Sequence, residues 1–302
     1  MRVGTRLLLL KLALAAALLA AVLAALHLLL PGLAPPGRKA GDPAIVVQAG
    51  AVRIAVPRHG GALATGSGFA RQVGAEFDAF LQALAAEVGP TLGLAPPERP
   101  VDVHVFAAHA EAAAFADERK MRADPAHPDA FYAPAAWAFA ATLRPARDLT
   151  ALLARLATRA ALDRAGAEAA WSPWLAEGLP ACFALTAPAA GGLRLRTDAR
   201  RDAAVVLSLA ARNAHVPLHM LVHGGPELFR GPLAPLASRE AGLFAAFLLW
   251  GNQGKRRDPF LRYLHLERQP GPAPPQTLEA TLGTPLKELE TQWFDFLQAL
   301  AR

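Results

Sequence analysis

The sequence is poor in cysteine, tyrosine and charged residues. Its 302 residues include one Cys and two Tyr, and 19% of them are charged. A single cysteine excludes a scaffold held by intramolecular disulfides, and it also excludes a zinc module built from several cysteines. The hydrophobic fraction of 53% excludes an intrinsically disordered chain, because so much apolar surface can offset the entropy lost on folding.

Only one long uncharged hydrophobic run is present, which excludes a transporter with several membrane spans. The run extends from Leu12 to Leu30, contains 19 residues, and follows Arg2, Arg6 and Lys11. A helix of that length can cross a bilayer, and a positive flank remains in the cytoplasm. We therefore expect an uncleaved signal anchor over residues 1–30, which makes the chain a single-pass inner-membrane protein with its body in the periplasm or another extracytoplasmic space. A cleaved signal peptide is the alternative.

The net charge of +6 belongs almost wholly to the first 40 residues. They hold five of the 31 basic residues and no acidic one, so the rest of the chain holds 26 basic against 25 acidic residues. A nearly neutral body lacks the basic surface that binding to phosphates requires. The composition therefore argues against a nucleic-acid partner and leaves the membrane as the partner of the N-terminal helix.

The order of predicted elements favours an α+β fold. Residues 31–43 are a linker rich in Pro and Gly, and residues 44–302 form the body. β-Branched residues on both sides of Ala49-Gly50 predict a hairpin over residues 45–56. Alternating hydrophobic residues predict strands near residues 101–106 and 137–143. Strands that precede a run of helices are typical of α+β domains. We expect a small N-terminal mixed sheet with helices, followed by a helical C-terminal half.

Helices are predicted from hydrophobic spacings of three and four residues. Phe69 to Val88 predicts a long helix that Pro90 should close, and Leu149 to Ala160 predicts a second one. Ser172 and Pro173 are typical of a helix start. Further helices are expected at 201–212, 217–223, 237–250, 257–266 and 284–300.

Most standard catalytic motifs are absent from the sequence. It contains no G-x-S-x-G nucleophile motif, no Walker A motif and no dinucleotide fingerprint. His215, His219 and His223 are spaced by four residues, as metal ligands on one helix would be. Pro217, however, is expected to start that helix and to leave His215 outside it. An ordinary polar helix face is the alternative that we favour, and a weak metal site is the other.

One segment resembles a known family. Trp174 to Leu179 reads W-L-A-E-G-L and follows Pro173. It is similar to the signature of the gluzincin-type bacterial peptidase MA-like domains, which are zincin-like metallopeptidases. The resemblance extends in order over about residues 45–300. It includes the segments 101–106, 131–134, 137–143, 240–250, 255–264 and 284–300.

The resemblance implies that a zinc site has been lost from the helix before this signature. In the family, that helix carries H-E-x-x-H, in which two His bind zinc and the Glu activates water, and the Glu of the later signature is the third ligand. In this chain Arg155 and Arg159 stand at the two His positions, Leu156 stands at the general base, and Glu177 alone is kept. An arginine side chain has no lone pair for a metal. The resemblance therefore implies that the zinc is lost and that no catalytic residue remains.

A replaced metal site predicts a specific ion pair. Arg155 and Arg159 lie one helical turn apart, so a guanidinium group could take the place of the zinc charge and pair with Glu177. The alternative is an ordinary polar stripe in which Arg159 pairs with Asp163 of its own helix. Pro180 departs from the family pattern and should kink or break the helix that carries Glu177.

Three classes of function are compatible with these features. The first is a non-catalytic peptidase-like domain that binds a peptide or an envelope protein, with Trp137, Phe139, Ala141 and Leu143 on an edge strand that pairs with it. The second is an enzyme, an active hydrolase or metallopeptidase, whose ligands come from scattered histidines. The third is a purely structural envelope protein whose groove has filled. The candidates for the second class are His104, His109, His127 and His219.

Overall fold

The computed structural model describes residues 44–58, 66–93, 100–165, 171–269 and 276–302. All of these residues belong to one unit, Pro43–Arg302. The predicted anchor at 1–30 and the linker at 31–43 lie outside the described residues.

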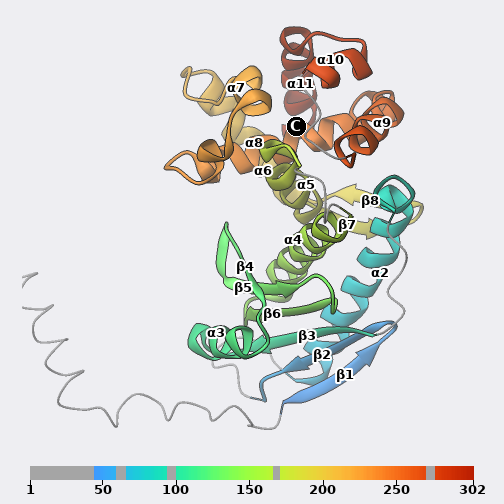
Figure 1. Cartoon of the computed structure of the whole chain (residues 1–302), viewed down its shortest axis with the longest axis vertical. Coiled ribbons are helices and arrows are strands. Elements are labelled where there is room, and N and C mark those ends of the chain that lie inside the picture. The colour runs from blue at the N-terminus through green and yellow to red at the C-terminus, as the bar shows by residue number, and fades with distance from the viewer. Residues whose placement is uncertain (1–43, 59–65, 94–99, 166–170, 270–275) are drawn as a thin grey trace, which may run out of the picture. The chain divides into compact units, whose positions relative to one another are not determined.

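A mixed six-stranded sheet is built from the N-terminal part of this unit. Its strands lie side by side in the order β1-β2-β3-β6-β5-β4 (Figure 1). Strand β3 is parallel to both of its neighbours, β2 and β6. The other three neighbouring pairs are antiparallel. Their bounds are β1 Ile45–Ala49, β2 Val52–Val56, β3 Val101–Phe106, β4 Arg122–Asp124, β5 His127–Ala133 and β6 Ala138–Thr142.

The helices form most of the remaining unit, together with a short hairpin. The hairpin consists of β7 (Thr186–Ala189) and β8 (Gly192–Leu195), which pair with each other. The helices are α2 Ser67–Leu92, α3 His109–Glu118, α4 Ala146–Ala165, α5 Pro173–Ala184, α6 Thr197–Ala210, α7 Leu218–His223, α8 Ala234–Trp250, α9 Arg257–Glu267, α10 Gln276–Leu282 and α11 Leu286–Ala301. Two 3-10 helices are η1 Pro226–Phe229 and η2 Gly251–Gly254. The α+β class, with the sheet before a helical half, is confirmed.

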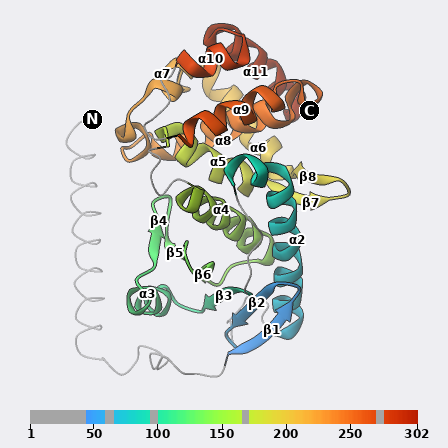
Figure 2. The same cartoon turned by 45° about the vertical axis from the view of Figure 1, so that its right-hand side comes forward.

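Alternation within the strands explains how the sheet is covered. Val101, Val103 and Val105 of β3 are buried and the residues between them are less so, as expected when one face packs on a hydrophobic core. Helices α2 and α4 lie against that face (Figure 2). Helix α3 covers the opposite face through a smaller cluster that includes Ala112 and Phe131.

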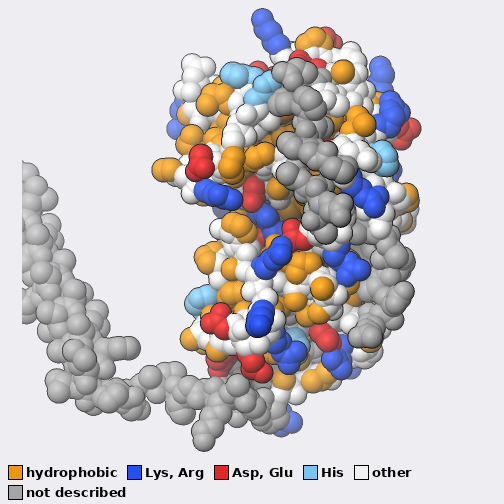
Figure 3. Space-filling model, viewed as in Figure 1, with side chains coloured by type: hydrophobic (Ala, Val, Ile, Leu, Met, Phe, Trp, Pro, Cys, Tyr) orange, Lys and Arg blue, Asp and Glu red, His pale blue; other side chains and the backbone are white. Residues whose placement is uncertain are grey.

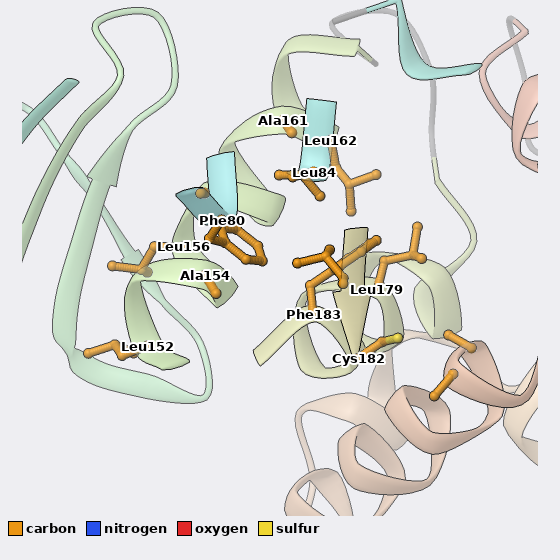
Figure 4. Packing of buried hydrophobic residues seen from close by; sticks show 14 of the residues in the cluster. Phe80, Leu84, Leu152, Ala154, Leu156, Ala161, Leu162, Leu179, Cys182 and Phe183 are labelled. Atoms are coloured by element: carbon orange, nitrogen blue, oxygen red, sulfur yellow. The ribbon is translucent and has the colours of Figure 1, made fainter. Parts of the chain in front are cut away.

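Helices α2, α4 and α5 meet in the main hydrophobic core. Phe80 and Leu84 of α2, Ala154 of α4 and Phe183 of α5 point toward one another there (Figure 4). Because helix α4 is covered by the sheet, by α2 and by α5, almost all of its middle residues are buried. Any charged residue on the middle of α4 therefore needs a partner inside the protein.

Close packing of α5 on α8 depends on glycine. A Cβ atom on Gly178 would lie 3.0 Å from the carbonyl oxygen of Ala241, and one on Gly242 would lie 3.0 Å from the amide nitrogen of Cys182. These distances are shorter than ordinary van der Waals contact, so the two helix backbones approach this closely only because neither glycine has a side chain. Gly178 follows Glu177 directly, and this contact thus fixes the helix turn that carries Glu177.

Two buried carboxyl groups hold the starts of segments in the helical half. Glu267 of α9 accepts a hydrogen bond of 3.0 Å from the backbone N–H of Ser172, which precedes α5, and a further one from the hydroxyl of Tyr263. Glu240 of α8 accepts a hydrogen bond of 2.9 Å from the N–H of Val216. Buried polar groups of this kind replace the water that the free N–H groups would otherwise bind.

Several sequence-based boundaries are corrected by the structure. Pro90 does not close α2, which continues to Leu92 and ends at Gly93 in the left-handed conformation. Pro180 does not end α5, which continues to Ala184. A proline removes one backbone hydrogen bond, and the burial of both helices in the core compensates for that loss.

The expected membrane placement is also corrected. Among the described residues, no helix has both the length and the apolar character needed to cross a bilayer. The expectation of a single-pass inner-membrane protein with a signal anchor and a periplasmic body rested on residues 1–30 alone, which are not among those described.

Candidate functional site

Two arginines of α4 lie inside the protein. Arg155 and Arg159 are one turn apart on the same face of the helix, and both are buried. Their neighbours Leu156 and Ala160 are fully buried in the hydrophobic core. Burial of an arginine is costly unless acidic groups lie beside it, so the positions of these two side chains require acidic partners.

Glu177 of α5 is one of those partners. Its Oε2 atom lies 3.0 Å from Nη2 of Arg155 and 2.7 Å from Nη2 of Arg159. The pairing predicted from the family resemblance is therefore present, with both arginines rather than one. The alternative pairing within α4 is absent, because Asp163 binds Arg122 of β4 and the hydroxyl of Tyr132 instead.

Asp124 of β4 is the second acidic partner, and sequence reasoning missed it. Its carboxylate lies 3.2 Å from Nε of Arg155 and 3.2 Å from Nε of Arg159. The same carboxylate accepts hydrogen bonds from the backbone N–H groups of Ala126 and His127, at 2.8 and 3.1 Å. Asp124 is therefore both the cap of the β4–β5 turn and a charge partner of α4.

The local sequence explains how Asp124 reaches this position. Pro125 follows it, and an Asp before Pro is typical of a turn in which the side chain binds N–H groups two and three residues later. This turn ends β4 and aims the carboxylate at α4. The Asp-Pro pair is a turn signal, but nothing in it indicates the distant arginines.

We call Asp124, Arg155, Arg159 and Glu177 the charge cluster. It joins β4, α4 and α5, and its two cations balance its two anions. Burial disfavours the charged form of Asp124, but the adjacent guanidinium groups outweigh this effect and hold its pKa below the ordinary value. Burial also disfavours the charged form of Arg159, but Glu177 and Asp124 outweigh that and raise its pKa. Both groups are thus ionised over the whole neutral range.

The chemistry of the charge cluster does not suit a metal ion. Guanidinium groups are permanent cations without a lone pair, and they contact both oxygens of Asp124 and Oε2 of Glu177. Leu156, at the position of the general base, is fully buried and cannot accept a proton. Within the described part of the chain, no three His, Cys, Asp or Glu side chains lie together in a way that could hold a metal.

The candidate histidines lie on separate elements. His104 is on β3, His109 on α3, His127 on β5 and His219 on α7. His127 lies near the charge cluster, where burial first and then the positive charge of Arg155 lower its pKa. His215 precedes α7, as predicted from Pro217, whereas His219 and His223 are on that helix.

The predicted edge strand is corrected by the sheet order. Trp137, Phe139, Ala141 and Leu143 were expected on an exposed edge, but β6 lies between β3 and β5 and pairs with both. Phe139 and Ala141 are fully buried. The polar segment after α3 forms the hairpin β4–β5, and that hairpin covers the edge of β6.

Strand β4 is one of the two true edges of the sheet, and it ends at the charge cluster. Arg122 and Ala123 are exposed, and Asp124 is buried. Figure 3 shows a hollow beside the end of the β4–β5 hairpin, with acidic and basic side chains on its floor. The side chains of Glu177 and Arg159 retain 12% and 10% exposure, whereas those of Arg155 and Asp124 retain 4% and 0%, so solvent reaches the charge cluster at Glu177 and Arg159.

Comparison with known proteins identifies no match. No protein-family model, no curated protein and no solved structure matches the chain.

Proposed function

We propose that this chain is a non-catalytic binding domain for extended polypeptide, built on a zincin-like fold of the peptidase MA-like type. In this proposal the charge cluster takes the place of a metal centre. The β4 edge and the adjoining hollow take the place of a substrate cleft. The ligand is a protein segment in extended conformation, which binds without being cut.

The charge cluster is the observation that carries the first half of the proposal. Under the resemblance to the peptidase signature, Arg155 and Arg159 stand at the two metal-binding histidines and Glu177 at the third ligand, and both arginines contact Glu177. Each guanidinium group contacts Asp124 through Nε and Glu177 through Nη2, so it links the two carboxylates by charge and by position. It can therefore maintain the arrangement of the helices α4 and α5 after a zinc ion is lost, but it cannot activate water.

The position of β4 supports the second half. An edge strand presents unpaired backbone N–H and C=O groups, and an extended peptide can pair with them as an additional strand. Strand β4 offers two exposed residues, Arg122 and Ala123, immediately before the charge cluster. The other edge, β1, lies at the far end of the strand order.

Hydrogen exchange of the full chain with carboxymethylated casein, an unfolded polypeptide, tests the proposal. We expect casein to slow amide exchange at residues 122–124 and to leave residues 45–49 unchanged, so that β1 serves as the internal control. Casein should remain uncut after prolonged incubation, and the purified chain should contain no stoichiometric zinc.

Two results would contradict the proposal. Casein cleavage with stoichiometric zinc that Glu177→Ala removes would mean that the chain is an active metallopeptidase. Unchanged exchange at β4 at saturating casein would mean that the edge binds no polypeptide and that the fold is structural.

A further inference from the structure

A cavity on the other side of α4 is independent of the charge cluster. It has a volume of about 460 Å³ and lies between α2, α4 and β7. Its apolar walls come from Ala75, Ala79, Phe80, Ala154 and Pro188. Both its size and its mainly apolar lining are typical of sites for small molecules.

Arg196 supplies the positive group of this cavity. It follows β8 and lines the cavity, and its side chain is only 10% exposed. The structure gives it one hydrogen bond, of 3.0 Å, from Nη2 to the carbonyl oxygen of Arg147. Its ion pair with Asp198 is long, at 3.9 Å, and Asp198 lies closer to Arg147, at 2.7 Å. A guanidinium group has five N–H donors, and among the described residues the hydrogen bond to Arg147 engages one of them.

The surroundings of Arg196 favour an anionic ligand. Burial first, and then the positive charge of Arg147, lower the pKa of Arg196, although Asp198, Glu76 and Asp148 oppose the shift. These acidic groups do not form a close pair with the guanidinium among the described residues. A ligand carboxylate would supply two acceptors in the geometry that a guanidinium group matches best.

Acidic neighbours also restrict the charge of the ligand. Glu76 lines the same cavity, and its carboxylate is held by Thr150 at 3.0 Å and by Gln72 at 3.1 Å. A doubly charged anion such as a phosphate monoester would be repelled by Glu76, Asp148 and Asp198. A singly charged carboxylate with an apolar body meets the cation with less repulsion, and its body fits against Phe80 and Pro188.

We propose that this cavity binds a small monocarboxylate with an apolar body, whose carboxylate pairs with Arg196. Two sources share this chemistry. One is a short fatty acid, and the other is an apolar amino acid, whose ammonium group could additionally bind Glu76. The proposal goes beyond the polypeptide-binding function and does not depend on it, because neither Arg196 nor the cavity contacts β4.

Calorimetric titration of the full chain with three probes tests this site. Hexanoate should bind, hexan-1-ol should bind about tenfold more weakly or not at all, and leucine distinguishes the two sources. Tighter binding of leucine than of hexanoate indicates an amino-acid site that uses Glu76, and the reverse order indicates a fatty-acid site. Both orders support a carboxylate site at Arg196.

Three variants locate the binding. Arg196→Gln should weaken hexanoate binding at least about tenfold, whereas Arg194→Gln, an exposed arginine of β8, should leave it unchanged. Ala75→Leu adds volume at an exposed wall of the cavity and should also abolish binding without removing a charge. Thermal unfolding of each variant establishes that it is folded, and Ala75→Leu provides a second measurement if Arg196→Gln does not fold.

The proposal is overturned by any of three results. These are no binding of either hexanoate or leucine to the unmodified chain at about millimolar concentration, binding of hexan-1-ol as tight as that of the tighter carboxylate, or equal binding of that carboxylate to Arg196→Gln and the unmodified chain. The casein exchange experiment at β4 involves none of these residues, so its failure and the failure of this site are distinguishable.

Discussion

Arg159 and Glu177 form an ion pair of 2.7 Å between the neighbouring helices α4 and α5. The pair is buried, and Arg155 contacts the same oxygen atom of Glu177 from the preceding turn of α4. Replacement of either partner by a neutral residue would leave an uncompensated charge in the protein interior. This uncompensated charge would lower the free energy of unfolding.

Glu177→Gln is therefore expected to lower the free energy of unfolding by about 3–5 kcal/mol. The change keeps the size of the side chain but leaves the charge cluster with two cations and one anion. Urea unfolding of the full chain measures the loss. The control is Asp102→Asn, which removes the partially exposed pair of Asp102 with Arg53 and should cost no more than about 1 kcal/mol. Equal losses for the two variants would contradict the structural role of the charge cluster.

The lowered pKa of Asp124 predicts that the free energy of unfolding falls at low pH. Its pKa is lower in the folded chain than its ordinary value, because Arg155 and Arg159 outweigh the effect of burial. The unfolded chain therefore takes up this proton first as the pH falls. The stabilisation is complete above about pH 4 and is lost as the pH drops through the folded pKa.

Urea unfolding between pH 2 and pH 6 should show this fall in the free energy of unfolding. Asp124→Asn should be less stable than the unmodified chain at pH 6, and the difference should shrink as the pH falls toward 2. A difference that stays constant over this range would mean that the ionisation of Asp124 does not contribute.

Glu240 predicts a pH dependence of the opposite sign. Burial raises its pKa to about 8, and the hydrogen bond from Val216 opposes this only in part, while Arg239 lowers the pKa and Glu290 raises it. Because the folded pKa lies above the unfolded one, the folded chain retains the proton as the pH rises. Stability contributed by the neutral carboxyl is therefore present below about pH 4 and falls by about 3–4 kcal/mol between pH 5 and pH 8.

Glu240→Gln should remove this fall. The amide keeps an acceptor for the N–H of Val216 and carries no charge. We expect the variant to be more stable than the unmodified chain at pH 8 and similar to it at pH 5, as measured by thermal unfolding. Parallel curves for the two proteins would show that Glu240 does not titrate in this range.

Gly178 predicts a steric effect at the contact of α5 with α8. Gly178→Ala places a Cβ atom 3.0 Å from backbone oxygen of Ala241, which cannot move without shifting a helix. We expect a loss of about 1–3 kcal/mol. The matched control is Gly68→Ala in the first turn of α2, where a Cβ atom meets nothing within 4 Å, and this change should stabilise by up to about 1 kcal/mol. Urea unfolding of both variants tests the steric effect, because the free energy of unfolding should fall for Gly178→Ala and should not fall for Gly68→Ala.

Elements with a strong local pattern were predictable from the sequence. The hairpin β1–β2, the strand β3 and the helix α11 follow from periodicity, because a half-buried element repeats its apolar residues at its own period. The pairing of Glu177 with the two arginines followed from their spacing on α4 and from the resemblance to the peptidase signature.

Features that depend on distant parts of the chain were not predictable. Strand β4 has three residues, two of them exposed, so it shows no hydrophobic alternation. The β7–β8 hairpin begins with Thr186-Ala187-Pro188, which favours no strand by itself. Asp124 meets Arg155 only because the sheet folds against α4, and no local rule reports a contact across 31 residues.

The hydrogen bond from the backbone N–H of Ser172 to Glu267 makes the start of α5 dependent on α9. Glu267 is 95 residues away in sequence, yet it holds the start of the helix that completes the charge cluster. During synthesis, residues 44–184 leave the ribosome well before residue 267 exists, and domains form when their contacts become available. The start of α5 therefore lacks its hydrogen-bond acceptor until α9 is made.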